Sequence, residues 1–188
     1  MDYNHYILTF YPDDTDLRRL LLKHSRQVAD RSLQIAARHP ELGADTELLE
    51  AAAMLHDIGI VRCSAPSILC HGDEPYIRHG LIGAEMLRSL AADDREALML
   101  EPLARVCERH TGTGLTAAQI ERQQLPLPRR DFCPETIEEQ IVCYADKFYS
   151  KSSPDRVRSV EQTALSLEKF GAEGVRKFLA WAERFESV

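Results

Sequence analysis

The chain has 188 residues, of which 44% are hydrophobic and 28% charged, and its formal net charge is −7. That length supports one domain with a hydrophobic core, and an acidic balance with both signs mixed along the chain disfavours binding to a long nucleic acid. The residues from Met1 to His5 do not resemble a secretory signal, and no apolar run is long enough to span a bilayer, so we expect no membrane association.

The cysteines are odd in number and contain no Cys-x-x-Cys pair; they are Cys63, Cys70, Cys107, Cys133 and Cys143. Structural zinc sites usually combine closely spaced cysteine and histidine ligands, and disulfides are typical of oxidising compartments. We therefore expect a reduced, cytoplasmic protein in which the cysteines serve mostly as small core residues.

Helical periodicity dominates the chain, and no two alternating runs pair convincingly as strands. In the first part, apolar residues recur at helical spacing and predict helices over residues 14–38, 45–57, 77–91 and 94–110. Leu98 is expected to face inward from the last of these helices. The segment 62–75 carries two prolines and one glycine and is predicted to be a loop.

The later part of the chain predicts helices over residues 116–123, 134–150, 155–170 and 173–186. Thr116 and Thr136 begin capping-box patterns for the first two, and Gly171 suits the end of the third. Residues 111–133 form a second long excursion, and such segments in a compact domain are usually functional or mobile. Together these elements predict one all-α domain of about seven or eight helices.

The motif His56-Asp57-Ile58-Gly59 closes the very apolar helix predicted over 45–57. A charged Asp57 at the end of such a helix is costly to bury unless a cation or a hydrogen-bond network compensates. Neighbouring residues on a helix point about 100° apart. A turn at Gly59 would let the imidazole and the carboxylate aim at one point. The motif therefore predicts a metal site.

Further polar residues lie on the apolar faces of other predicted helices: His24, His79, His110 and Asp146. Each histidine alone is adequately explained as a core residue bound to one backbone carbonyl. An unpaired buried polar group costs about 1–3 kcal/mol, so the whole set favours a shared metal centre. Four histidines and two carboxylates suit one or two ions of Fe, Mn, Co, Ni or Zn better than Ca or Mg.

The order of these residues resembles that of the HD-domain superfamily of metal-dependent phosphohydrolases, in its HDIG-containing branch. The resemblance runs from His24 to Asp146, and the stretch 109–114 (Arg-His-Thr-Gly-Thr-Gly) is similar to a motif of one small subgroup. It implies one HD domain over residues 1–188, a helical bundle with a core over 14–150 and C-terminal helices over 155–186. It also implies a first metal held by His24, His56, Asp57 and Asp146, and a second held by His79 and His110 with Asp57 bridging.

The resemblance implies hydrolysis of a phosphate monoester or diester by a hydroxide held between the ions, with Asp57 as the residue that holds both. Nucleotides or related small phosphorylated metabolites are the expected substrates. Lys147 directly follows Asp146 and is a candidate contact to the substrate phosphate. Pairing of Lys147 with a nearby acid is an equally good interpretation.

Two other functions use the same pattern. Some proteins with this fold and the same six ligands are di-iron oxygenases, and the ligand set serves either chemistry. A non-catalytic nucleotide-sensing domain is the third alternative, and the intact ligand set counts against it. The oligomeric state is left open. His5 and His39 are expected at the surface, and the pair Arg129-Arg130 is expected to be solvated rather than to contact a phosphate.

Overall fold

The computed structural model describes residues 2–187, and that part of the chain is predominantly helical. Its nine α-helices are α1 (Tyr3–Phe10), α2 (Asp16–Arg38), α3 (Thr46–Leu55), α4 (His79–Arg88), α5 (Asp94–Arg109), α6 (Ala117–Arg122), α7 (Ile137–Asp146), α8 (Val160–Leu167) and α9 (Ala172–Glu186). The predicted all-α class is confirmed. The helix that the sequence pattern did not predict is α1.

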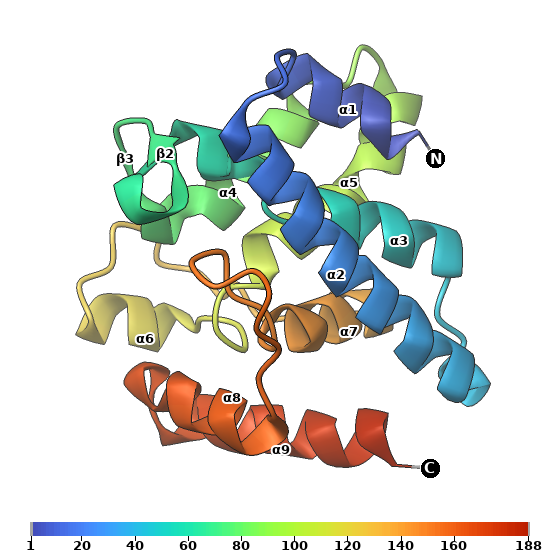
Figure 1. The fold of residues 1–188 in the computed structure, drawn as a ribbon, viewed down its shortest axis with the longest axis vertical. Coiled ribbons are helices and arrows are strands. Elements are labelled where there is room, and N and C mark those ends of the chain that lie inside the picture. Colours follow the sequence, from blue (N-terminus) through green and yellow to red (C-terminus); the bar gives the residue numbers. More distant parts are fainter. Residues whose placement is uncertain (1, 188) are drawn as a thin grey trace.

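The centre of the fold is built by α2, α3, α4, α5 and α7. Helix α4 packs along α5, and α2 packs along α3 and α7. Figure 1 shows α2 crossing the molecule, with α3 and α7 beside it. On α2, the side chains of Leu21, Val28 and Ile35 are fully buried, and their spacing of seven residues keeps them on one face of the helix. Helix α2 therefore directs its apolar face into the interior of the bundle.

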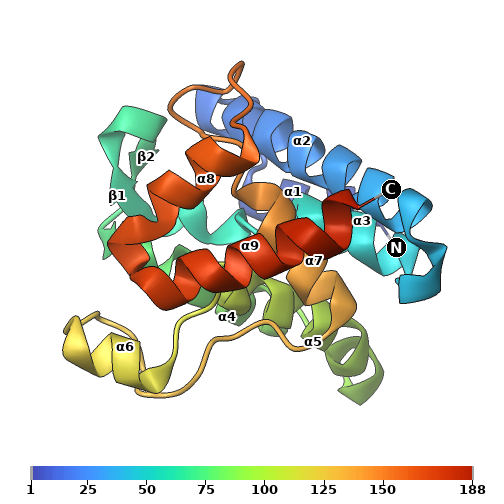
Figure 2. The same ribbon diagram turned by 90° about the horizontal axis from the view of Figure 1, so that it is seen from below.

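The C-terminal helices form a layer on one side of this centre, as Figures 1 and 2 show. Helix α9 packs on both α7 and α8. Its buried Phe178 lies with its ring centroid 5.1 Å from that of Tyr144 on α7. His39 is only 8% exposed, and one of its ring nitrogens, Nε2, lies 3.1 Å from the carbonyl oxygen of Phe185. The prediction that His39 is a surface residue is wrong because α9 covers it.

The segment 62–75 is not the loop that the sequence predicts. It contains the strands β1 (Cys63–Ala65), β2 (Cys70–His71) and β3 (Glu74–Pro75), in the sheet order β2-β1-β3. Strand β1 pairs with β2 in antiparallel and with β3 in parallel orientation. Strands of two or three residues are too short to show an alternating pattern, which is why the sequence did not predict them.

Short 3-10 helices complete the secondary structure: η1 (Pro40–Leu42), η2 (Ile58–Arg62), η3 (Pro66–Ile68), η4 (Tyr76–Arg78) and η5 (Glu168–Phe170). Leu98 is 77% exposed, so its predicted inward position is wrong. The buried stripe of α5 instead passes through Leu100, Leu103 and Cys107. Among the described residues, no helix is both long enough and apolar enough to cross a membrane.

Candidate metal centre

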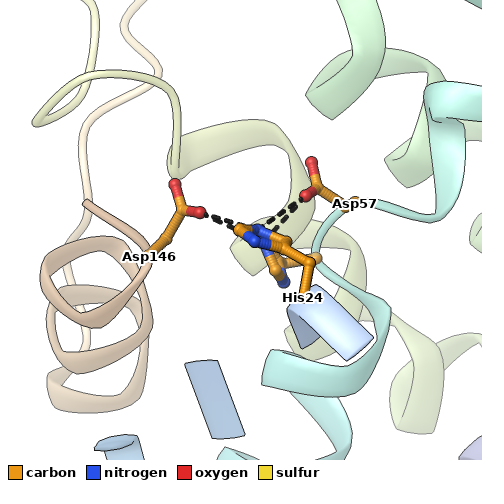
Figure 3. Close-up of side chains that lie close together, drawn as sticks. His24, Asp57 and Asp146 are labelled. Atoms are coloured by element: carbon orange, nitrogen blue, oxygen red, sulfur yellow. Dashed lines mark hydrogen bonds and ion pairs between the residues drawn. The ribbon is translucent and has the colours of Figure 1, made fainter. Parts of the chain in front are cut away.

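Six polar side chains from five helices converge at the centre of the bundle. His24 lies on α2, His56 and Asp57 follow α3, His79 begins α4, His110 follows α5, and Asp146 ends α7. All six are at most 9% exposed. Figure 3 shows His24 between the carboxylates of Asp57 and Asp146. The structure therefore brings together all the residues that the sequence proposed as metal ligands.

The turn that carries the His-Asp pair is held by close backbone packing. Helix α3 ends at Leu55, and η2 starts directly after Asp57. A Cβ atom on Gly59 would lie 2.2 Å from the carbonyl oxygen of His79 and 2.5 Å from the amide nitrogen of Gly83. Gly59 is not among the glycines with positive φ. A glycine is therefore required here because η2 approaches α4 closely, and not because of the turn conformation that the sequence suggested.

The first ligand group consists of His24, His56, Asp57 and Asp146, whose potential ligand atoms lie within 4.8 Å of one another. Nε2 of His24 lies 3.0 Å from Oδ1 of Asp146 and 3.2 Å from Oδ2 of Asp57. Nε2 of His56 lies 3.1 Å from the same Asp57 oxygen. Two imidazoles and two carboxylates thus surround one point.

The second ligand group consists of Asp57, His79 and His110. Oδ1 of Asp57 lies 3.4 Å from Nε2 of His79 and 3.5 Å from Nε2 of His110. The two oxygens of Asp57 are therefore divided between the two groups: Oδ2 faces the first and Oδ1 faces the second.

The backbone fixes the orientation of three of the histidine rings. Each Nδ1 atom lies 2.6–2.7 Å from the carbonyl oxygen three residues earlier, which pairs His56 with Ala53, His79 with Tyr76 and His110 with Cys107. A carbonyl oxygen only accepts hydrogen bonds, so each Nδ1 carries the proton and donates it. In the neutral ring, Nε2 is then left as a lone-pair donor directed into the site.

The geometry of the pair His79 and His110 suits a cation between the two rings. Their Nε2 atoms are 2.9 Å apart. Burial, reinforced by His110, lowers the pKa of His79 to about 3, and burial also lowers the pKa of His110. Both rings are therefore neutral at neutral pH, and two lone pairs face each other. Together with Asp57, whose buried Oδ1 atom has no hydrogen-bond partner, this donor set fits a transition-metal ion.

Charge around Asp57 favours its ionised form. Burial alone would raise the pKa of this carboxyl, but Lys151 and His56 outweigh it and hold the pKa well below its usual range. Burial would likewise lower the pKa of His56, and the carboxylates of Asp57 and Asp146 instead raise it to about 9. The centre thus attracts positive charge strongly.

Lys151 is the important residue that sequence reasoning missed. Its ammonium group forms an ion pair with Oδ2 of Asp57, and its side chain is only 11% exposed. Lys151 lies beyond the end of α7 in a serine-rich segment, where no helical period marks its direction. Only the fold reveals its place beside the candidate metal ligands.

Lys147 contacts a nearby acid, as one of its two interpretations predicts. Its Nζ donates to Oδ2 of Asp146 over 2.6 Å and to the carbonyl oxygen of His110 over 2.8 Å. Lys147 also lines the cavity described below. It is therefore placed both to hold Asp146 and to face a bound molecule.

A cavity of about 570 Å³ opens beside the second ligand group. His79, His110 and Asp146 lie in its wall, together with Tyr76, whose ring stacks on that of His79 at a centroid distance of 4.6 Å. The basic residues of the wall are Lys147, Lys151, Arg158 and Lys169, and its one acidic residue is Asp146. A protein with a net charge of −7 thus gathers positive charge around this cavity.

The two long segments 62–75 and 111–133 contribute unequally to the cavity wall. From 62–75, Ala65, Ser67 and Ile68 line the cavity, whereas 111–133 contributes only Thr111 and Gly112. The rest of the second segment carries α6, which lies at the edge of the molecule in Figures 1 and 2.

Arg129 and Arg130 of that second segment, and Arg109 just before it, form ion pairs away from the cavity. Arg129 pairs with Glu121, and Arg130 pairs with the buried Glu108. Arg109, in the glycine-rich motif, contacts Glu135 and Glu139 and so joins α5 to the start of α7. None of these three arginines lines the cavity.

Comparison with known proteins gives one family match and several relatives. The family model of the HD domain matches residues 21–150, a range that contains all six candidate ligands. The tRNA (cytidine(56)-2'-O)-methyltransferase of Picrophilus torridus is 36% identical over 143 residues, which are 76% of this chain and 34% of that protein. The enzyme of the same name from Thermoplasma volcanium is 30% identical over 168 residues, 89% of this chain and 42% of that protein.

An uncharacterized protein of Methanocaldococcus jannaschii is 36% identical over 128 residues, which are 67% of this chain and 64% of that protein. The chain therefore spans less than two thirds of the length of each of these three relatives.

Two solved structures share the fold. The HD domain of the Listeria monocytogenes phosphodiesterase PgpH in complex with cyclic-di-AMP has a TM-score of 0.51 and 14% identity, covering 100% of this chain and 99% of that one. A structure of the same domain described without the nucleotide has a TM-score of 0.50 and the same identity, covering 99% of each chain. At this identity the likeness concerns the fold alone.

Proposed function

Because this chain belongs to the HD domain family, we propose that it is a metal-dependent phosphohydrolase that acts on a nucleotide or another small phosphate ester. The observation that carries the proposal is the division of Asp57 between two groups of histidines whose ring nitrogens converge. The first ion would be held by His24, His56, Asp57 and Asp146. The second would be held by His79 and His110, with Asp57 shared.

Ions of Fe, Mn, Co, Ni or Zn bound to these side chains supply an activated water and stabilise negative charge on the phosphoryl oxygens. The chain's own residues hold the geometry. Carbonyl groups fix the rings of His56, His79 and His110 through their Nδ1 protons. Lys147 and Lys151 contact the ligand carboxylates and also line the cavity, so their ammonium groups are within reach of phosphate oxygens there.

The cavity supports a substrate of nucleotide size. Ligand pockets typically enclose about 300–1,000 Å³, and this one has about 570 Å³. Its four basic wall residues favour an anionic molecule, and the acidic surface charge of the whole chain disfavours a long nucleic acid.

We do not extend methyl transfer to this chain. The methyltransferase name belongs to proteins of which the chain spans 34% and 42%. The cluster of histidines and carboxylates is instead a ligand set for metal-assisted chemistry.

The test is a hydrolysis assay with nucleotides, dinucleotides and phosphosugars after loading the protein with Mn, Fe, Co or Ni. We expect phosphate release, or dinucleotide cleavage, that depends on the added metal and is absent in Asp57→Ala. Lys23→Met is the matched control, because Lys23 forms only an exposed pair with Asp155. If no compound is hydrolysed with any metal, and the iron-loaded protein takes up O₂ in a substrate-dependent manner, the oxygenase is favoured instead.

A further inference from the structure

The outer wall of the cavity is built by a part of the chain that the family match does not include. The HD match ends at residue 150. Beyond it, the residues in the cavity wall are Lys151, Ser152, Arg158, Ser166, Leu167 and Lys169. They come from the segment after α7 and from α8 and η5. This wall therefore extends the cavity beyond the part of the chain that the HD domain model matches.

Arg158 is firmly placed in that wall. Its backbone N–H donates to the carbonyl oxygen of Phe148 over 2.9 Å, which closes the segment from 149 to 157 into a loop. Its Nη1 atom lies 3.4 Å from the carbonyl oxygen of Lys147, which it faces as a donor. Arg158 is half-buried as a residue and lines the cavity.

The positive charge of Arg158 is not matched by a carboxylate. Lys147 contacts Asp146 and Lys151 contacts Asp57, so both lysines are associated with proposed metal ligands. Arg158 forms no ion pair with any of the residues 2–187. A guanidinium that faces a cavity and has several N–H groups left over is well suited to bind a phosphate through two parallel hydrogen bonds.

We propose that Arg158, together with Lys169 on the same wall, forms a second phosphate subsite, so that the substrate carries two phosphoryl groups. One group would lie at the metal centre and the other at Arg158. This inference rests on the proposed function only for the phosphoryl group at the metal centre. Ser67 and Ser152 also line the cavity and carry hydroxyl groups, which are donors suited to oxygen atoms of a ligand.

The experiment compares a one-phosphate with a two-phosphate probe. Binding of adenosine 5′-monophosphate and adenosine 3′,5′-bisphosphate is measured by calorimetry on the metal-loaded wild type, Arg158→Ala, Arg158→Lys and Arg156→Ala. Arg156 is the matched control, because it is exposed in the same segment and does not line the cavity. Melting temperatures of all variants establish that they are folded.

We expect the wild type to bind the bisphosphate more tightly than the monophosphate. Arg158→Ala should weaken bisphosphate binding by about tenfold or more, since a charge-assisted hydrogen bond is lost, and should leave monophosphate binding nearly unchanged. Arg158→Lys should retain part of the preference, and Arg156→Ala all of it.

Three results would overturn the second subsite: no preference of the wild type for the bisphosphate, no binding of either probe, or equal weakening of both probes by Arg158→Ala. The proposed function fails differently. If the Arg158-dependent preference is found but no phosphate ester is hydrolysed with any metal, the subsite stands and the hydrolase assignment does not.

Discussion

Asp57 is the residue on which both ligand groups depend, because Oδ2 faces His24 and His56 and Oδ1 faces His79 and His110. Loss of this carboxylate therefore damages both proposed metal sites, whereas loss of a histidine in the second group damages one. The metal content of variants at Asp57 and at the second-group histidines should therefore differ.

We expect Asp57→Ala to lose both ions and to reduce activity by more than about 100-fold, because removing even a residue that only supports a ligand typically costs 10–100-fold. His110→Ala should lose mainly one ion. Elemental analysis of the purified variants counts the metal per chain, and Asp57→Asn, which keeps the side-chain shape, controls for misfolding. Full metal content and activity in Asp57→Ala would refute the bridging role.

Lys151 pairs with the Asp57 oxygen that faces the first ligand group, so a metal ion bound there would act on the same atom. Breaking a buried ion pair leaves an uncompensated charge and costs about 3–5 kcal/mol. We therefore expect Lys151→Met to be strongly destabilised in the presence of a chelator and much less so with bound metal, which supplies positive charge to Asp57. Chemical denaturation under both conditions measures the two free energies of unfolding.

The control for this comparison is Lys23→Met, since an exposed pair such as Lys23 with Asp155 contributes about 0–1 kcal/mol. It should unfold like the wild type in both conditions. An equal loss of stability for Lys151→Met with and without metal would mean that Lys151 is not linked to the metal centre.

At the scale of elements, α1 supports the turn that carries the His-Asp pair. The hydroxyl of Tyr11, at the end of α1, donates to the carbonyl oxygen of Ile58 over 2.8 Å and accepts from the N–H of Val61 over 3.1 Å. Both partners belong to η2, which follows Asp57 directly. An N-terminal helix that the sequence pattern did not predict thus fixes the backbone beside Asp57.

Tyr11→Phe should lower the free energy of unfolding by about 1–3 kcal/mol, because it leaves buried backbone groups without their partner. It should also weaken metal binding, which competition with a chromogenic chelator measures. Tyr6→Phe on the same helix is the matched control, since the Tyr6 hydroxyl has no hydrogen-bond partner among residues 2–187. Identical stability of the two variants would contradict this role of α1.

Regular helices made most of the candidate ligands predictable from the sequence, and irregular segments did not. His24, His79, His110 and Asp146 could be singled out because each is a polar residue on the apolar face of a regular helix. Lys151 could not, because it lies outside any periodic element. The short strands in 62–75 show no alternation of apolar and polar residues. The inward position predicted for Leu98 is wrong because the buried face of α5 is narrower than its apolar residues suggest.

At the scale of the whole molecule, we propose that residues 1–188 act as one domain. The C-terminal helix α9 packs on α7, the helix that ends at Asp146, so the C-terminal layer is joined to the helix that supplies a ligand. Unfolding of the layer should then disturb the metal centre, and the two should not melt separately.

We expect one cooperative thermal transition whose midpoint rises when metal binds. A ligand at 100 times its Kd stabilises the folded state by about 2.7 kcal/mol, and this corresponds to roughly 5–10 °C for a domain of this size. Calorimetry with a chelator and then with added Mn or Co measures the shift. Two separate transitions, with only one sensitive to metal, would show that the C-terminal helices are an independent unit.

The most direct test of the metal centre is a crystal structure of the metal-reconstituted protein with anomalous scattering recorded at the absorption edge of the added ion. We expect two peaks about 3.5–4 Å apart, one among His24, His56, Asp57 and Asp146 and one beside His79 and His110, with an oxygen of Asp57 directed at each. Absence of any peak at this cluster in fully reconstituted protein would contradict it.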